Sequence, residues 1–185
     1  LAAAQTDNGR FLEHSLIYAL IEIGDAKGTA VGLQSKNPYT QRAALIALDQ
    51  MPGAFLTAMQ LLPRLASNEE VLRKTALWLF ERHPEMANEM AGFLKKQLAR
   101  AAALSNEERA ELERQLAGFA HDPAVQQVMT DALATEARAT RWLVFDAIAG
   151  TSIKKIPVAW GKAVETELTG KDEAVTRAAL KVGYT

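Results

Sequence analysis

The chain carries the segment Arg42-Ala43-Ala44-Leu45-Ile46-Ala47-Leu48, and a similar segment, Lys74-Thr75-Ala76-Leu77-Trp78-Leu79-Phe80, follows 32 residues later. Looser versions of the same pattern occupy residues 141–148 and 177–182. A period of about 30 to 50 residues is typical of proteins built from repeated helical hairpins. One hairpin cannot cover its own apolar face, so we expect the next hairpin to cover it.

The composition favours the same class of fold. Of the 185 residues, 49% are hydrophobic but only 6% are aromatic, and alanine and leucine, both strong helix formers, abound. No segment alternates between apolar and polar residues in the way a strand does. The sequence therefore predicts an all-α protein: a tail over residues 1–8, then one HEAT-like α–α superhelix of about five helical pairs over residues 9–185.

Individual helices follow from apolar spacing and from capping residues. We expect helices over residues 9–23, 29–33, 38–51, 54–66, 69–82, 85–104, 106–120, 123–135, 136–149, 157–168 and 172–182. Asn37 and Asp122 precede prolines and are good N-caps. Ser67 and Ser105 are each followed three residues later by glutamate, which predicts two capping boxes.

Apolar spacing also predicts which side chains are buried. The first helix should bury one stripe, made of Phe11, Leu12, Leu16, Ala19, Leu20 and Ile23. The helix over residues 69–82 should bury Val71, Leu72, Thr75, Ala76 and Leu79, together with Trp78.

Two resemblances agree with this fold. Residues 37–48 resemble the second helix of a HEAT repeat. A narrower resemblance, over residues 9–183, is to the helical-repeat region of large planctomycete proteins described as membrane-bound dehydrogenases or haem-binding proteins. It rests on residues 10–23 and 42–51, on Ala76-Leu77-Trp78 with His83-Pro84-Glu85, and on Ile156-Pro157 with Trp160.

In those proteins a β-propeller dehydrogenase-like domain precedes the repeats and a c-type cytochrome domain follows them. The resemblance implies that this chain is the connecting helical domain, and that the parent protein is an oxidoreductase that is exported or associated with a membrane. The chain has no cysteine, so it has no Cys-x-x-Cys-His haem motif. The redox chemistry of the family is therefore assigned to no residue here.

Histidine is the first residue type to consider for chemistry. The chain has three, His14, His83 and His121, and no two stand at the i,i+4 spacing of a helical metal site. His14 shares one stripe of its helix with Tyr18 and Glu22, which fits either a polar site or a hydrogen-bonded terminal repeat. His83 directly precedes Pro84, and His121 directly precedes Asp122-Pro123. We interpret both histidines as helix terminators.

The tryptophans give the alternative function. Trp78, Trp142 and Trp160 lie in different helical pairs, and some HEAT-like DNA glycosylases hold a damaged base with aromatic and acidic residues on a basic concave face. The net charge of −1, from 21 basic and 22 acidic residues of mixed distribution, argues against such a face. Tryptophan at helical spacing more often packs in a core or lines a groove.

Paired charges have simpler explanations than catalysis. The acidic pairs at residues 69–70, 107–108 and 172–173 lie in first helical turns, where negative charge is favourable. The lysine pairs at residues 95–96 and 154–155 fit a solvated surface, and neither a phosphate-binding glycine loop nor a nucleophile elbow is present. The sequence therefore predicts no catalytic, cofactor-binding or metal-binding residue.

The predicted function is a non-catalytic scaffold, spacer or protein-interaction domain of a larger dehydrogenase-like protein. Its partners would be another protein or flanking domains of the same chain, without nucleic acid and without membrane insertion. The interaction face would be built from the second helices and include Arg42, Lys74, Arg141 and Arg177 or their neighbours. The partner, the compartment and the oligomeric state stay open. Because we expect the chain to be a piece of a longer protein, Leu180 and Val182 of the last helix should both be exposed.

Overall fold

The computed structural model describes residues 9–168 and 173–182, and within these ranges it contains eleven α-helices and no strand. The chain divides into two compact units, residues 1–86 and residues 87–185. The helices of the first unit are α1 (Gly9–Ile23), α2 (Ala26–Val31), α3 (Pro38–Gln50), α4 (Ala58–Leu65) and α5 (Glu70–Arg82). Those of the second are α6 (Ala87–Leu98), α7 (Asn106–Phe119), α8 (Pro123–Leu133), α9 (Arg138–Ala149), α10 (Val158–Leu168) and α11 (Glu173–Val182).

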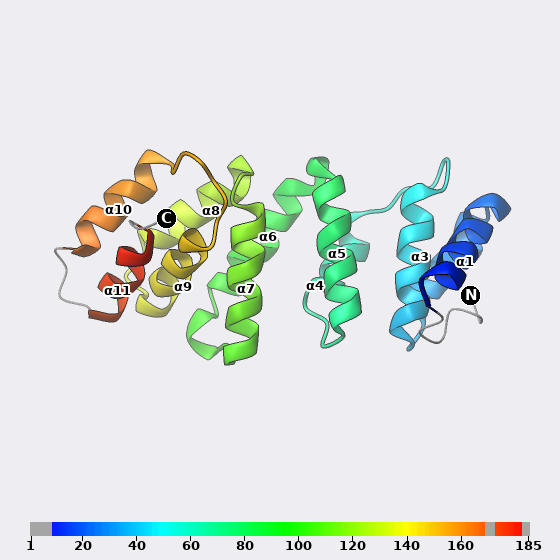
Figure 1. Ribbon diagram of the computed structural model, residues 1–185, viewed down its shortest axis with the longest axis horizontal. Helices are drawn as coiled ribbons and strands as arrows, with labels where there is room; N and C mark the ends of the chain where they lie inside the picture. The colour runs from blue at the N-terminus through cyan, green and yellow to red at the C-terminus, as the bar shows by residue number, and fades with distance from the viewer. Residues whose placement is uncertain (1–8, 169–172, 183–185) are drawn as a thin grey trace. The chain divides into compact units, whose positions relative to one another are not determined.

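In both units the chain folds into consecutive helical hairpins (Figure 1). In the first unit α2 packs on α3 and α4 on α5, and α3 also packs between α1 and α5. In the second unit the hairpins are α6–α7, α8–α9 and α10–α11. There α9 packs between α7 and α11, while α8 packs against both α6 and α10. We call α3, α5, α7, α9 and α11 the second helices, because each ends a hairpin.

The second helices share one pattern of buried positions. The buried residues at these shared positions are Thr40, Ala43, Ala44, Ala47 and Leu48 in α3; Leu72, Thr75, Ala76, Leu79 and Phe80 in α5; Leu112, Gln115, Leu116, Phe119 and Ala120 in and just after α7; Thr140, Leu143, Val144, Ala147 and Ile148 in α9; and Val175, Ala178, Ala179 and Val182 in α11. Leu45 of α3 and Phe145 of α9 are buried in addition, at a sixth position that these two helices share. Each set repeats the spacing i, i+3, i+4, i+7, and every set except that of α11 also includes i+8. This spacing places all members of a set on one face of their helix. Successive sets begin between 28 and 40 residues apart, so the connections differ in length while the buried face is retained.

Several expected helix starts are confirmed by their hydrogen bonds. Asn37 Oδ1 accepts from the backbone N–H groups of Tyr39 and Thr40, at 2.9 and 3.2 Å. Asp122 Oδ1 caps α8 in the same way. Ser105 Oγ accepts from the N–H of Glu108, whose carboxylate accepts from the N–H of Ser105, so the capping box is present. These groups satisfy N–H donors that the first helical turn leaves without a backbone partner.

Several local expectations were wrong. The helix expected over residues 29–33 is instead α2, followed by a 3₁₀ turn, and the helix expected over residues 54–66 begins only at Ala58. Ser67 does not cap α5, because this helix begins only at Glu70. The hydroxyl oxygen of Ser67 instead accepts a hydrogen bond from the N–H of Glu69, in the turn before the helix. The single helix expected over residues 85–104 is instead α6 with a 3₁₀ turn on each side, at Pro84–Met86 and Ala101–Ala103. Leu104 then adopts an extended backbone that leads to the Ser105 cap.

The core of the first helix also differs from the expected stripe. Ile17 is buried against Ala43 and Ala47 of α3, and Leu16, Leu20 and Ile21 pack around it. Phe11 is 91% exposed, and Leu12 and Ile23 are also exposed. The apolar residues of α1 surround much of the helix, so their spacing left the buried side ambiguous.

The last helix gives a mixed outcome. Leu180 is exposed as expected, whereas Val182 is buried among the residues of the second unit. Among the residues that the structure describes, no helix is both long enough and apolar enough to cross a membrane.

Candidate functional site

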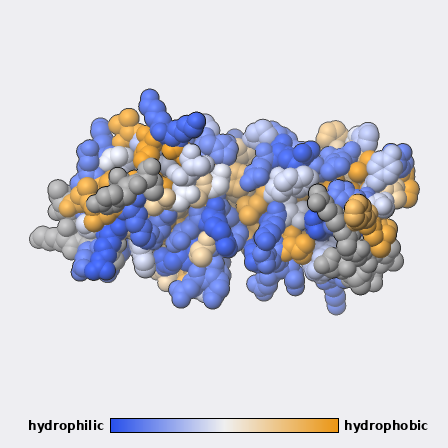
Figure 2. Space-filling model, in the orientation of Figure 1, coloured by the Kyte–Doolittle hydropathy of each residue, from blue (hydrophilic) through white to orange (hydrophobic). Residues whose placement is uncertain are grey.

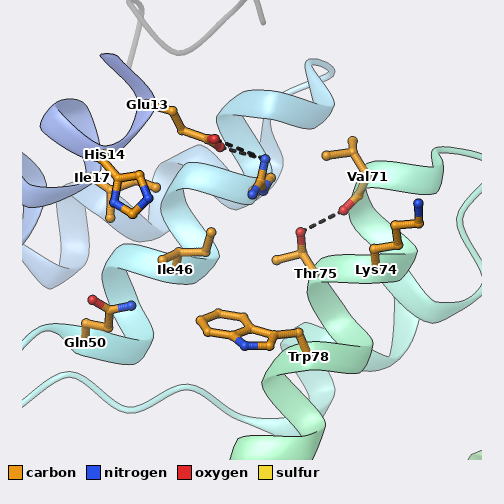
Figure 3. A pocket seen from close by; sticks show the side chains of 10 residues that line it. Glu13, His14, Ile17, Ile46, Gln50, Val71, Lys74, Thr75 and Trp78 are labelled. Atoms are coloured by element: carbon orange, nitrogen blue, oxygen red, sulfur yellow. Dashed lines mark hydrogen bonds and ion pairs between the residues drawn. The ribbon is translucent and has the colours of Figure 1, made fainter. Parts of the chain in front are cut away.

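A groove of about 510 Å³ runs along the first unit between α1, α3 and α5 (Figure 3). Ile17, Ile46, Val71 and Trp78 supply apolar surface, and the polar lining consists of Glu13, His14, Arg42, Gln50, Lys74 and Thr75. Figure 3 shows Ile46 between the His14 side chain of α1 and the Trp78 ring of α5. The groove thus combines apolar surface with two cations and one carboxylate.

The second unit has a groove of about 410 Å³ between α9 and α11, lined by Arg138, Trp142, Glu173, Arg177, Ala178 and Lys181. When the buried positions of the second helices are aligned, the two grooves use the same places on their helices. Arg42, Lys74, Trp142 and Arg177 are equivalent, and so are Ile46, Trp78 and Lys181. We call the residues at these two positions of the second helices the second-helix face.

One expected member of this face lies elsewhere. Arg141 does not line the groove, and its neighbour Trp142 does. Arg141 Nη1 instead forms an ion pair of 3.0 Å with Glu167 of α10. The repeat pattern aligned Arg141 with Arg42, but Leu143 and Val144 occupy the buried positions that follow, so the pattern in α9 is displaced by one residue.

An arginine stacks on each groove tryptophan. In the first unit the Arg82 guanidinium carbon lies 5.1 Å from the centroid of the Trp78 ring. In the second, that of Arg109 lies 4.9 Å from the Trp142 ring. Both tryptophans are 38% exposed, so the expected burial of Trp78 was wrong. A cation over one face of an indole restricts the ring and leaves its remaining surface available for contacts.

Four of the ion pairs that hold the groove cations can be described. Arg42 pairs with Glu13 at 2.9 Å, Lys74 with Glu70 at 2.6 Å and Lys181 with Asp146 at 2.5 Å, and Arg177 pairs with Glu173. Hydrophilic side chains predominate on the face seen in Figure 2, with hydrophobic ones scattered among them. The lining of each groove therefore carries charges of both signs.

His83 belongs to a charged cluster, and Arg82 of this cluster stacks on Trp78 in the groove of the first unit. Its Nε2 lies 2.6 Å from Asp49 Oδ1 and its Nδ1 lies 2.6 Å from Glu85 Oε1. The Asp49 side chain is 2% exposed and also accepts from Arg82 Nε at 3.3 Å. Arg82 stacks on Trp78 in turn. His83 is the C-cap of α5, as a helix terminator would be, but the sequence did not indicate its two carboxylate partners.

The hydrogen bond to Asp49 is the main reason that the pKa of His83 is raised. Burial of the ring opposes this effect, and the hydrogen bond to Glu85 adds to it. The folded protein therefore binds this proton more tightly than the unfolded chain does. The stabilisation is fully present below the unfolded pKa of about 6.5 and is lost as the pH rises through the raised folded pKa.

We accordingly expect the melting temperature of the first unit to fall as the pH rises from about 6 to about 8, and His83→Gln to flatten this dependence. Thermal unfolding followed by circular dichroism at several pH values measures it. His121→Gln, which removes a histidine at the end of α7, is the matched control. An unchanged pH dependence in His83→Gln would show that the His83–Asp49 contact does not stabilise the fold.

The other candidate residues do not assemble into a chemical centre. His14 lines the groove, whereas Tyr18 is exposed on the same helix, where a hydrogen bond with Glu22 raises the pKa of the tyrosine. Trp160 is fully buried and does not line either groove. Within residues 9–168 and 173–182, no cluster of three or more histidine, aspartate or glutamate side chains has an arrangement that could hold a metal ion.

Comparison with known proteins adds no identification: no family model, no curated protein and no solved structure matches this chain.

Proposed function

We propose that this chain is a HEAT-like α-solenoid that acts as a non-catalytic interaction scaffold and binds protein segments on its second-helix face. The consecutive hairpins and the shared buried positions of the second helices support the solenoid. In such a stack each repeat covers its neighbour, and the outward positions can vary without loss of the core.

The observation that carries the binding function is the placement of both grooves at equivalent positions of the second helices, each with one half-exposed tryptophan under an arginine. Tryptophan and arginine dominate the binding energy of many protein interfaces. A partly exposed indole held by a cation needs little further ordering when a partner contacts it. In the setting implied by the family resemblance, the partner would be a cytochrome or propeller domain of the parent protein.

The charge distribution favours a protein partner over nucleic acid. A duplex-binding surface gains affinity by releasing counterions from many phosphates, which needs unpaired cations in a row. Here Arg42, Lys74, Arg177 and Lys181 are each already paired with a carboxylate. We therefore expect no gel shift of duplex DNA at moderate salt, and a salt-resistant shift would favour the nucleic-acid enzyme instead.

A selection of random displayed peptides against the whole chain tests protein binding. We expect the selected peptides to lose about tenfold or more in affinity for Trp78→Ala or Trp142→Ala, because both variants remove a groove aromatic. Met59→Ala in α4 and Val158→Ala in α10 are the matched controls, since both residues are exposed and neither lines a groove. Peptides that bind all four variants like the original chain would rule out the second-helix face as the binding surface.

A further inference from the structure

Five side chains of the first unit form a series of contacts that ends in its groove. Asp49 Oδ1 lies 2.6 Å from Nε2 of His83, and Glu85 Oε1 lies 2.6 Å from Nδ1 of the same ring. The other oxygen of Asp49 accepts a hydrogen bond of 3.3 Å from Arg82 Nε. The guanidinium carbon of Arg82 lies 5.1 Å from the centroid of the Trp78 ring, and Trp78 lines the groove. One carboxylate and one arginine thus connect a titratable histidine to a groove aromatic.

The two contacts of His83 fit its charged form. An imidazole with a carboxylate at each nitrogen can donate to both only when both nitrogens carry a proton. After loss of one proton, one nitrogen presents a lone pair to a carboxylate, and that contact is lost. The Glu85 side chain is 65% exposed and can turn to water, whereas that of Asp49 is 2% exposed. His83 therefore keeps Asp49 as its partner but no longer places a positive charge beside it.

The charged groups around His83 come from three elements of the first unit. Among its described residues, α3 supplies Asp49, the 3₁₀ turn after α5 supplies Glu85, and α5 itself supplies Arg82. The helix α4 also packs on α5, but its Arg64 donates hydrogen bonds to groups outside this cluster. Of these described groups, Arg82 is the cation that remains beside Asp49 when His83 is neutral.

Arg82 can move in response to that change. Its side chain is 50% exposed, and its 3.3 Å contact with Asp49 is longer than the roughly 2.7 to 2.9 Å of a close bond between a cation and a carboxylate. A neutral His83 no longer repels the guanidinium from the carboxylate that both contact. The stacking of an arginine on a partly exposed indole is a weak interaction, so a change of one neighbouring charge can displace it.

We propose that His83 is a pH-sensitive switch for the groove of the first unit: when it loses its proton, Arg82 moves toward Asp49 and away from the Trp78 ring. The indole is then no longer restricted by the cation above it. Because Asp49 raises the pKa of His83, the change falls above the ordinary histidine value of about 6.5. The inference goes beyond the proposed function, since the change in the groove needs no binding partner.

The test follows the indole N–H resonances of the whole chain, labelled with ¹⁵N-tryptophan, by NMR between about pH 5.5 and 9. The Trp78 resonance, assigned by its absence in Trp78→Phe, should shift through one ionisation with the same midpoint as the His83 ring protons. It should stay in place in His83→Gln. In Arg82→Gln it should move less than half as far, while His83 still titrates. Glu85→Gln should move both midpoints to lower pH by the same amount, about 0.5 pH unit or more.

His14 and Trp142 provide the matched controls. His14 also lines the groove, and His14→Gln should leave the Trp78 shift unchanged. Trp142 also lies under an arginine, but the described lining of its groove includes no histidine, so its resonance should move less than half as far as that of Trp78.

Three results would overturn the inference. The first is a Trp78 resonance that stays in place over this pH range. The second is an equal shift of that resonance in His83→Gln or in Arg82→Gln. The third is a Glu85→Gln variant that moves the midpoint of His83 but not that of Trp78, and this exposed substitution decides the question if His83→Gln does not fold. None of these measurements uses a peptide, so the proposed function stands or fails separately.

Discussion

Trp160→Ala should lower the free energy of unfolding by about 3 to 5 kcal/mol, the cost of deleting a large aromatic side chain from a core. Trp160 is 0% exposed and is the largest fully buried side chain of the described residues. Its Nε1–H donates a hydrogen bond of 3.0 Å to Thr130 Oγ1, which ties α10 to α8. The substitution removes both the packing volume and this hydrogen bond. Urea unfolding followed by circular dichroism measures the change.

Two further variants separate these contributions. Trp160→Phe retains most of the packing but loses the indole N–H, and should cost about 1 to 2 kcal/mol. Trp142→Ala removes the same kind of side chain from an exposed position and should cost about 1 kcal/mol or less. If Trp160→Ala were no more destabilising than Trp142→Ala, the core position of Trp160 would be refuted.

Glu167→Ala should lower the free energy of unfolding by about 3 kcal/mol, because it leaves the Arg141 guanidinium in a largely buried place without its carboxylate. The Glu167 side chain is 11% exposed and lies 3.0 Å from Arg141, and this contact joins α10 to α9. The expected value is at the lower end for a broken buried pair, since about a quarter of Arg141 reaches solvent. Chemical denaturation of the variant and the original chain measures the difference.

A double substitution tests the explanation. Arg141→Met with Glu167→Leu replaces both charges by apolar groups of similar size, and should recover most of the lost stability. Glu173→Ala breaks the exposed pair with Arg177 and should cost about 0.5 kcal/mol or less. A double variant as unstable as Glu167→Ala would show that packing, and not the isolated charge, determines the loss.

The helical class and most helix boundaries could be predicted because they depend on neighbouring residues. Asn37, Ser105 and Asp122 act on N–H groups two or three residues away, so local sequence contains the necessary information. Ser67, like Ser105, is followed three residues later by glutamate, which is the sequence of a capping box. The helix after Ser67 nevertheless begins later than this sequence indicates, and Ser67 lies in the turn before Glu69.

The groove residues could be predicted only in part, since they meet through packing of separate helices. Arg42, Lys74 and Arg177 followed from the repeated segment and do line the grooves. Trp142 was displaced by one position from the assumed alignment, and Trp78 was assigned to the core because an indole is apolar. The stacking of Arg82 on Trp78 joins residues four apart on α5, so helical spacing could have indicated it. The stacking of Arg109 of α7 on Trp142 of α9 joins separate helices, and the sequence did not indicate it.

The positions of the three tryptophans allow intrinsic fluorescence to follow the unfolding of each unit. Trp78 belongs to residues 1–86, whereas Trp142 and Trp160 belong to residues 87–185. The buried indole of Trp160 should emit at a short wavelength. The half-exposed indoles of Trp78 and Trp142 should emit at longer wavelengths, closer to that of tryptophan in water. A chain with Trp78→Phe and Trp142→Phe retains the buried Trp160, so its fluorescence would report the loss of the second unit, whereas its circular dichroism would report the loss of helix in both units. Coincident transitions of the two signals would show that the units unfold as one cooperative body, and separated transitions would give the stability of each.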